Sequence, residues 1–442
     1  MTEAALQQTG ETEQSPVAKR VVWPWRYYTL LILTLVLSVS IFDRYVMTIL
    51  VEPIRRELHL SDTQIGFLNG FAFVIIYAIF CFPAARLADT WSRINVIAIA
   101  LSAWSVMTML CGLARTPLQL FLARFGVGFG EAGGLSPAQA LVGDIFPRHQ
   151  RGTAMSILLL ASPIGLSGGL ALGGLALAHY GWRTTFLLAG VPGLILAPLV
   201  LFTLPRVPNG MSDGGVTAKP APVWRTIAHL LSIRSFVFAV LAATAQAGLS
   251  MGFSTWLAAF MERSHGMEHA AIGATLGGAL GLGSLIGHLA GGPLLDVLGK
   301  HDLRWHFRIP AICAPLSGII AAIAFIAPIG VALPLLGLQV LLAGLFAGPM
   351  YAILTNLAPA ESRAMAAAIF GFVVNIIGLG GGPLIVGGLS DFLAPQFGRE
   401  SLRIALLIAT VIVLPAMVFF MLAGRSYRAD IAAAEARRLA SA

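Results

Sequence analysis

The chain has 442 residues, of which 57% are hydrophobic and only 11% are charged; its mean hydropathy is +0.84 and its formal net charge is +8. A soluble protein with this balance would leave apolar surface exposed to water, so the composition excludes an ordinary soluble protein and indicates a chain that crosses a membrane many times. The positive charge is spread over the segments between apolar stretches, which excludes a nucleic-acid-binding protein.

A helix needs about 20 apolar residues to cross a hydrocarbon core about 30 Å thick. Twelve segments qualify, and helices are the economical structure for them because a membrane offers no water to backbone groups. In chain order, the predicted spans cover residues 27–50, 64–87, 95–113, 117–142, 152–178, 184–204, 233–260, 270–295, 309–328, 331–355, 365–389 and 403–422. The three cysteines lie within spans, and we expect them to be small buried hydrophobes and not a disulfide or metal site.

The basic residues predict the orientation. If the chain starts in the cytoplasm, 19 Lys and Arg fall on the cytoplasmic side, seven fall on the outer side, and Arg44 and Arg124 fall within spans. The positive-inside rule therefore places both termini in the cytoplasm of a multi-pass protein of the cell (inner) membrane. Residues 1–22 are polar, and we expect a disordered N-terminus without a signal-peptide pattern.

The two halves of the chain repeat. "ARLADTWSR" (85–93) matches "GPLLDVLGK" (292–300), and "IGLSGG" (164–169) matches "IGLGGG" (377–382) at nearly the same offset. Ordered matches of this kind predict a duplicated six-helix bundle. The predicted parts are an N-terminal bundle (23–204), a cytoplasmic linker (205–232), a C-terminal bundle (233–424) and a cytoplasmic tail (425–442).

The charged residues of the cytoplasmic loops are candidate gates. Contacts between them would hold an outward-facing state and break on inward opening, or they would serve only topology and stability. These residues are Asp89, Arg93, Asp144, Arg151, Asp296 and Lys300.

The repeated loop motif, with twelve spans in two halves, resembles the major facilitator superfamily. Ala85 and Ser92 replace the glycines of the family motif in the first half, whereas Gly292 and Gly299 keep them in the second. A narrower likeness, carried by "FDRY" at 42–45 and by the segments 124–147 and 151–169, resembles the Spinster branch. The resemblance implies an all-α membrane protein of twelve transmembrane helices in two pseudo-symmetric six-helix bundles. For the branch it implies lysophospholipid or sphingosine-1-phosphate transport, with proton coupling in bacterial forms.

Four ionisable residues at membrane depth are the candidate machinery: Asp43, Arg44, Arg124 and Glu131. A charge there costs roughly 2.5–3.5 kcal/mol on insertion scales, so it needs a partner or a task. Burial favours a protonated carboxyl group and a nearby arginine favours the ionised form. An anionic substrate that engages Arg124 would take a counter-charge from Asp43, which would then bind a proton more readily. Glu131 is a second proton carrier, and the alternative is a structural ion pair inside the bundle.

Two further details concern the same helices. The seven-residue spacing of Arg124 and Glu131 places them on one helix face, with Gly128 between them leaving room for another helix, a substrate or water. Arg44 points about 100° away from Asp43 and is expected to pair with Glu131 or to face another helix.

The second bundle lacks such charges, so the cavity would be charged on one wall and mainly apolar on the other. Its candidate substrate contacts are Gln246, Trp256, Tyr351 and Asn375, beside Arg124 and Arg44 in the first bundle. This asymmetry suits an amphiphile with a charged head and a hydrocarbon tail better than a sugar. His288 is a second protonatable candidate, although a histidine there more often makes a local hydrogen bond.

The sequence therefore predicts a proton-coupled secondary transporter for a lysophospholipid or related single-chain lipid, working by alternating access. Its partners would be protons, the substrate and membrane lipids, and we expect a monomer without cofactor, metal site or catalytic residues. One alternative is a transporter of the same fold for a drug or small organic anion, and another is a transport-dead receptor. A lipid enzyme is disfavoured because no catalytic set assembles at membrane depth.

Overall fold

The computed structural model describes residues 23–147, 150–207, 223–302, 304–357 and 363–441, and within these ranges the chain is almost entirely helical. The first half contains α1 (Trp23–Ile49), α2 (Val51–Glu57), α3 (Asp62–Asn69), α4 (Phe71–Thr90), α5 (Arg93–Leu113), α6 (Pro117–Glu131), α7 (Leu135–Ile145), α8 (Arg151–Leu159) and α9 (Ala161–Thr203). The second contains α10 (Val223–Ser232), α11 (Arg234–His265), α12 (His269–His301), α13 (Trp305–Ile326), α14 (Ile329–Leu357), α15 (Arg363–Val373), the π-helical η4 (Val374–Gly380), α16 (Gly381–Phe397), the short η5 (Gly398–Glu400), α17 (Ser401–Ala409), the short η6 (Thr410–Ile412) and α18 (Val413–Ser441).

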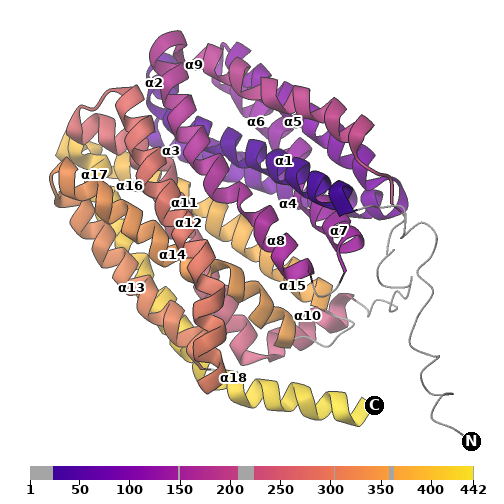
Figure 1. Cartoon of the computed structure of the whole chain (residues 1–442). Helices are drawn as coiled ribbons and strands as arrows, with labels where there is room; N and C mark the ends of the chain where they lie inside the picture. Colours follow the sequence, from indigo (N-terminus) through magenta and orange to yellow (C-terminus); the bar gives the residue numbers. More distant parts are fainter. Residues whose placement is uncertain (1–22, 148–149, 208–222, 303, 358–362, 442) are drawn as a thin grey trace, which may run out of the picture.

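These helices confirm the predicted fold class. Eight helical segments of the described chain are long and apolar enough to cross a membrane, and two of them, 53 and 65 residues long, each contain two predicted spans. The remaining two predicted spans, the fourth and the tenth, correspond to the pair α6–α7 and to the helix α14. The helices of the first half gather on one side of the molecule and those of the second half on the other, as two bundles (Figure 1).

Several spans are built from two helices rather than one. The second span breaks at Gly70, the fourth breaks between α6 and α7, and the eleventh passes through the π-helical turn η4. Spans five and six, predicted with a loop between them, are joined in α9 through the single residue Gly181, whose φ of 75° suits glycine because it has no Cβ. α18 continues unbroken from the last predicted span through Gly424 to Ser441, so the predicted tail is part of the same helix.

The predicted disordered segment 1–22 and most of the predicted linker lie outside the described residues. The last third of the linker is the short helix α10. The terminal side of the molecule is the side on which α1 begins and α9 ends, and the distal side is the side that carries α2 and the start of α3.

The bundles meet where α9 packs on α12 and where α3 packs on α16. Glycine allows the closest approach at both contacts. A Cβ added to Gly273 of α12 would lie 2.4 Å from the carbonyl oxygen of Leu170, and one added to Gly66 of α3 would lie 2.4 Å from that of Pro383. The glycine-rich stretches of helices five and eleven therefore lie at close contacts between helices.

Gly273→Ala should force the bundles apart on the distal side, because the new methyl group would overlap backbone atoms that cannot turn away. Overpacking of this kind costs about 1–3 kcal/mol. The measurement is a spin-label distance between cysteines placed at the exposed residues Arg115 and Arg399, one on each bundle, with Cys81 replaced by Ser. Gly278→Ala in the same helix is the matched control, since nothing lies within 4 Å of its added Cβ. Equal distances in the two variants would contradict the prediction.

Candidate functional site

The four predicted membrane-depth charges come together where α1 packs near α6. The Nη2 atom of Arg44 lies 2.6 Å from Oε2 of Glu131, and its Nε donates to the same oxygen at 2.9 Å. Ser40, one helical turn earlier, donates its hydroxyl to that oxygen at 2.8 Å. Of the two partners predicted for Arg44, the structure therefore shows Glu131.

Asp43 and Arg124 are buried as deeply as Glu131, at 1% and 2% exposure. Thr108 of α5 donates its hydroxyl to Oδ2 of Asp43 at 3.1 Å. The other carboxyl oxygen of Asp43 has no hydrogen-bond partner among the described residues, and neither do Nε and Nη1 of Arg124. The cluster thus holds one formed ion pair and, beside it, an acid and a base with unused hydrogen-bonding capacity.

Aromatic rings of α4 cover the two arginines. The guanidinium carbon of Arg44 lies 4.6 Å from the ring centre of Phe73 and 5.6 Å from that of Tyr77, and that of Arg124 lies 5.7 Å from Phe73. Such contacts stabilise a cation more when it is removed from water. Gly128 of α6 allows this approach, because a Cβ there would lie 2.5 Å from the carbonyl oxygen of Phe73. The space at Gly128 is therefore filled by a helix.

Sequence reasoning missed Ser40, Thr108, Phe73 and Tyr77. Ser40 lies one turn before Arg44 in α1, and Phe73 and Tyr77 lie one turn apart in α4, so helical spacing was an available signal for both. Nothing in the sequence indicated that Thr108 of α5 would face Asp43.

The candidate contacts from the second bundle are more scattered. Gln246 of α11 is buried, and neither end of its side-chain amide has a hydrogen-bond partner among the described residues. Trp256 is fully buried and donates its indole N–H to the carbonyl oxygen of Pro383 at 3.0 Å, so in this conformation it packs against α16. Asn375 lies half-buried in η4, and π-helical turns occur often at functional sites. The side chain of Tyr351 lies outside the described residues.

His288 makes the local contact that was expected. Its Nδ1 donates to the carbonyl oxygen of Ser284, one turn earlier in α12, at 2.8 Å. This bond belongs to one helix and joins no other element.

The candidate gate residues on the terminal side are only partly brought together. Arg93 forms ion pairs with Asp144 and, at 3.6 Å, with Asp89, and all three belong to the first bundle. Arg151 donates its Nε to the carbonyl oxygen of Phe146 at 3.2 Å. Lys300 is exposed, and the side chain of Asp296 lies outside the described residues. Their role as gates remains a prediction.

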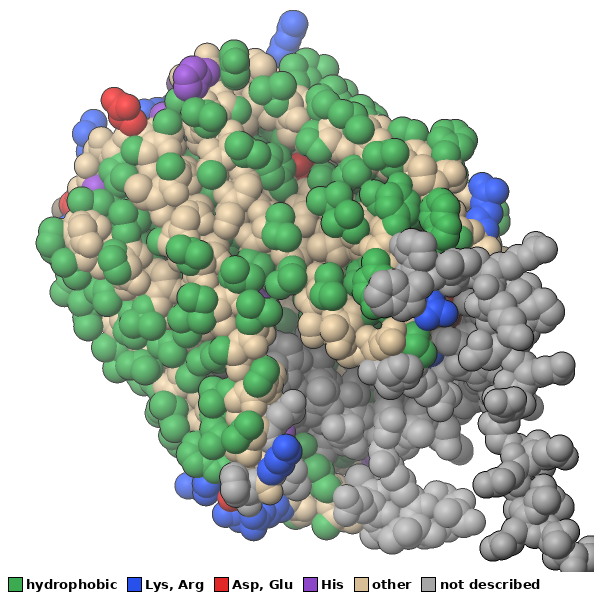
Figure 2. All heavy atoms as spheres, viewed as in Figure 1, with side chains coloured by type: hydrophobic (Ala, Val, Ile, Leu, Met, Phe, Trp, Pro, Cys, Tyr) green, Lys and Arg blue, Asp and Glu red, His purple; other side chains and the backbone are tan. Residues whose placement is uncertain are grey.

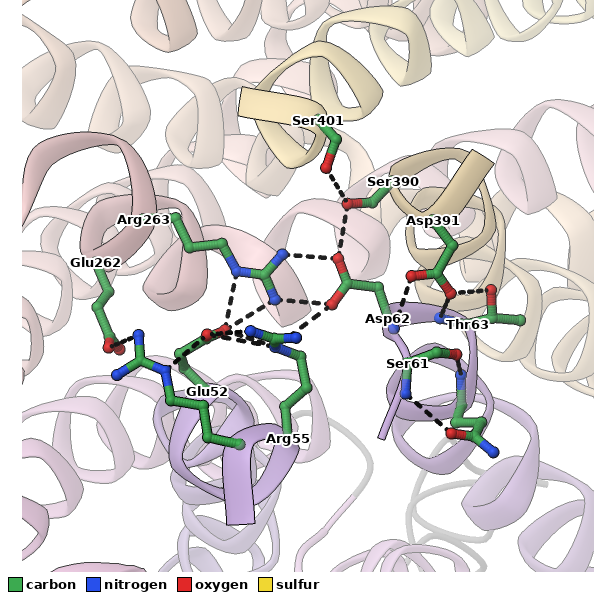
Figure 3. Close-up of polar contacts among 12 residues, drawn as sticks. Glu52, Arg55, Ser61, Asp62, Thr63, Glu262, Arg263, Ser390, Asp391 and Ser401 are labelled. Atoms are coloured by element: carbon green, nitrogen blue, oxygen red, sulfur yellow. Dashed lines mark hydrogen bonds and ion pairs between the residues drawn. The ribbon is translucent and has the colours of Figure 1, made fainter. Parts of the chain in front are cut away.

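A polar network on the distal side, which the sequence did not predict, joins the two bundles (Figure 3). Arg263 at the end of α11 contacts both oxygens of Asp62 at 2.7 Å each, and it contacts Glu52 of α2 at 2.8 Å. Arg55 and Arg56 also bind Glu52, and Arg56 reaches Glu262 of the second bundle at 2.7 Å. Three acids and three arginines therefore balance one another across the interface.

Figure 3 also shows a second contact between the bundles, at the N-terminus of α3. Asp391 of α16 accepts hydrogen bonds from the backbone N–H groups of Asp62 and Thr63, at 3.1 and 2.7 Å, and from the Thr63 hydroxyl at 2.6 Å. The first N–H groups of a helix lack partners within that helix and favour a negative charge. A carboxylate of the second bundle thus caps the N-terminus of α3 in the first.

The arginines of this network determine the ionisation of Glu52. Burial alone would raise the pKa of Glu52, but the hydrogen bond from Arg55 and the charge of Arg263 outweigh it and lower the pKa to about 2. Glu52 therefore stays a carboxylate at any physiological pH.

A family model described as Major Facilitator Superfamily matches residues 33–383. The chain belongs to the major facilitator superfamily. An "MFS-type efflux pump" of Mycolicibacterium smegmatis is 34% identical over 90% of this chain and 93% of that protein. The probable galactarate/D-glucarate transporter GudP of Bacillus subtilis is 26% identical over 66% of this chain and 70% of that protein. The sphingosine-1-phosphate transporter SPNS2 of Mus musculus is 26% identical over 91% of this chain and 78% of that protein.

Solved structures agree with this assignment. The crystal structure of a bacterial homolog to the human lysosomal transporter Spinster, in an inward-facing and unoccupied conformation, superposes with a TM-score of 0.81. It is 24% identical, and the match covers 92% of this chain and 99% of that one. The fold of this homolog and the relative SPNS2 together confirm the resemblance to the Spinster branch. Family and fold point to a multi-pass membrane transporter and not to an enzyme.

Proposed function

We propose that the protein is a proton-coupled secondary transporter that moves a lysophospholipid or related single-chain amphiphile by alternating access. One observation carries this proposal: Arg124 is buried beside Asp43 with two guanidinium nitrogens unpartnered among the described residues. A buried arginine with unused donors is costly unless an anion arrives to use them. The anionic head of a substrate is such a partner.

The two carboxyl groups would couple this binding to protons. Glu131 accepts hydrogen bonds from Arg44 and Ser40, so its protonation would weaken its hold on Arg44. The Arg44 side chain is 24% exposed and would then be free to contact the head of the substrate. When that head engages Arg124, Asp43 loses a compensating charge and becomes the next proton acceptor. Cargo and proton occupancy are linked in this way without covalent chemistry.

The orientation proposed from the basic residues places the terminal side in the cytoplasm and the distal side outside. Arg263 and Asp391 then join the bundles at the outer surface, so the conformation is closed to the outside. Support comes from the solved Spinster homolog, whose inward-facing conformation superposes on this chain. Opening to the outside would require this network to separate.

The lipid substrate class is supported by the charged first bundle, by the absence of comparable charges among the described residues of the facing helices, and by the relative SPNS2. A second candidate is a drug or a small organic anion. It is favoured by the relatives named as an efflux pump and as a probable galactarate/D-glucarate transporter. The same arginines would bind a carboxylate as readily as a phosphate.

A substrate panel in proteoliposomes, with and without an imposed pH gradient, distinguishes these candidates. We expect gradient-dependent movement of a lysophospholipid such as lysophosphatidylglycerol and none of galactarate. The opposite pattern would select the organic-anion transporter. Binding of either ligand without movement in any gradient would instead indicate a transport-dead receptor.

Arg124→Gln should weaken binding of a phosphate-headed lysolipid by roughly 10- to 100-fold, because a hydrogen bond to a charged group contributes about 1.5–3 kcal/mol. An uncharged monoacylglycerol should bind with unchanged affinity. Both can be measured by calorimetry on the purified protein. Arg115→Gln, on an exposed loop, is the matched control. If the variant loses the charged and the uncharged ligand equally, Arg124 does not recognise the head group.

A further inference from the structure

The structure holds a cavity of about 330 Å³ on the terminal side, between α13 and α18 of the second bundle. Its walls combine three arginines with apolar side chains: Arg304, Arg308, Arg425, Phe307, Phe420 and Met421. The membrane-depth charges lie on α1 and α6 of the first bundle, so this cavity is separate from the proposed transport site.

The positive charge at the cavity exceeds the negative charge around it. Asp302 is the acidic residue at this end of α13, and it is already engaged by Arg428 at 2.9 Å, by Arg308 at 3.5 Å and by the backbone N–H of Arg304 at 2.9 Å. The Nε atom of Arg304 is buried without a hydrogen-bond partner among the described residues. Arg304 and Arg425 form no ion pair with an acidic side chain among the described residues, so the cavity offers cationic groups to an anion.

An apolar surface leads away from the cavity along both helices. On α13 the side chains that continue the face of Arg308 are 42–58% exposed, and on α18 those that precede Met421 are 46–50% exposed: Ile312, Leu316, Ile319, Ile323, Leu414 and Val418. Their spacing of three or four residues places each set on one helix face. Figure 2 shows Lys and Arg side chains gathered at the lower end of a face that is otherwise mostly hydrophobic.

One further contact indicates where the cavity lies relative to the membrane surface. The guanidinium carbon of Arg308 lies 5.6 Å from the ring centre of Trp305. Tryptophan is enriched where the hydrocarbon of a membrane meets the head groups. The arginines therefore lie at the level of the head groups, and the exposed aliphatic side chains of α13 and α18 extend from them toward the hydrocarbon. This arrangement matches a molecule with an anionic head and long acyl chains.

We propose that this cavity binds an anionic phospholipid, with the phosphate among Arg304, Arg308 and Arg425 and the acyl chains along the apolar faces of α13 and α18. Basic pockets between helices at the cytoplasmic surface are suited to such head groups. With the orientation proposed above, the lipid comes from the inner leaflet. It acts as a bound membrane component and is not cargo, because the cavity opens at the periphery of the second bundle.

The test is lipid binding to the purified, delipidated full chain, measured by native mass spectrometry. The ligands are phosphatidylglycerol, phosphatidylcholine with the same acyl chains, and inorganic phosphate. The charge variant is Arg308→Gln with Arg425→Gln. The control, Arg206→Gln with Arg234→Gln, removes two exposed arginines from the same side of the protein but outside the cavity. Met421→Trp blocks the cavity and leaves every charge in place.

We expect one phosphatidylglycerol to bind preferentially to the wild-type and control proteins. The charge variant should bind it roughly 30-fold more weakly, since each basic residue near a membrane surface contributes about 1 kcal/mol. Met421→Trp should also lose it. Equal binding of phosphatidylcholine, full competition by inorganic phosphate, unchanged binding in both cavity variants, or a dimer that these variants abolish would overturn the proposal. Transport is not measured, so the result is independent of the proposed function.

Discussion

Proton-driven uptake of a lysophospholipid into proteoliposomes should fall to background when Asp43 is replaced by Asn. Asparagine has the same size and can still accept the hydrogen bond from Thr108, so local packing is kept. It cannot take up a proton, and it presents no charge that Arg124 must balance. Exchange of substrate across the membrane without a pH gradient should survive, because the bundles can still tilt while carrying cargo.

The matched control for this variant is Asp430→Asn. Asp430 lies on α18, where it accepts a hydrogen bond from the backbone N–H of Ser235 at 2.8 Å, far in the chain from the charged cluster. It should keep gradient-driven uptake. A second readout needs no substrate: the distance between labels at Arg115 and Arg399 should respond to pH in the wild type and not in the Asp43 variant. Uptake that still follows the gradient in Asp43→Asn would refute the role of this residue as proton carrier.

The proposed cycle joins two kinds of polar contact that respond to different things. In that cycle the partners of the buried acids Asp43 and Glu131 would change as cargo arrives, whereas Glu52 and Asp62 are paired with arginines at the distal end. Opening the distal side would require the pairs of Arg263 with Glu52 and Asp62 to separate. In the proposed cycle, proton and cargo occupancy at the membrane-depth cluster would decide when they do.

The sequence predicted the fold and the four charges because both follow from local patterns. Apolar runs of membrane length and the two matching loops required no knowledge of packing. An isolated charge such as Arg124 is easily recognised within those apolar runs, so it could be predicted as a candidate site residue. The contacts of each charge could not be predicted, because Thr108 and Phe73 lie on other helices whose rotation about their axes the sequence does not determine.

The distal network was missed for a related reason. Glu52, Arg263 and Asp391 lie on three helices far apart in the chain, just beyond the ends of predicted spans, and charged residues there are ordinary in any membrane protein. Only the closed arrangement of the bundles makes them neighbours. The same holds for Trp256, which has the composition of a ligand contact but donates to Pro383 in this conformation. Contacts between helices far apart in the chain leave little trace in local sequence pattern.

Arg263→Gln should shift the protein toward an arrangement in which the two bundles are separated on the distal side. Removing this side chain leaves Asp62, at 4% exposure, with Arg55 at 3.8 Å as its remaining cation, whereas Glu52 keeps Arg55 and Arg56. Breaking a buried ion pair in this way costs about 3–5 kcal/mol, which corresponds to a shift of at least roughly 100-fold in the ratio of distal-closed to distal-open molecules. The population of long distances between labels at Arg115 and Arg399 should therefore become dominant.

Arg56→Gln is the matched control, because the Arg56 side chain is 60% exposed and an exposed ion pair contributes at most about 1 kcal/mol. The effect of Arg263→Gln should be the same at pH 5.5 and pH 7.5. The pKa of Glu52 is lowered to about 2, so its contribution is complete above its ordinary value near 4.5 and is lost only as the pH falls toward 2. A shift confined to the acidic sample, or one equally large in Arg56→Gln, would show that Arg263 does not hold the bundles together.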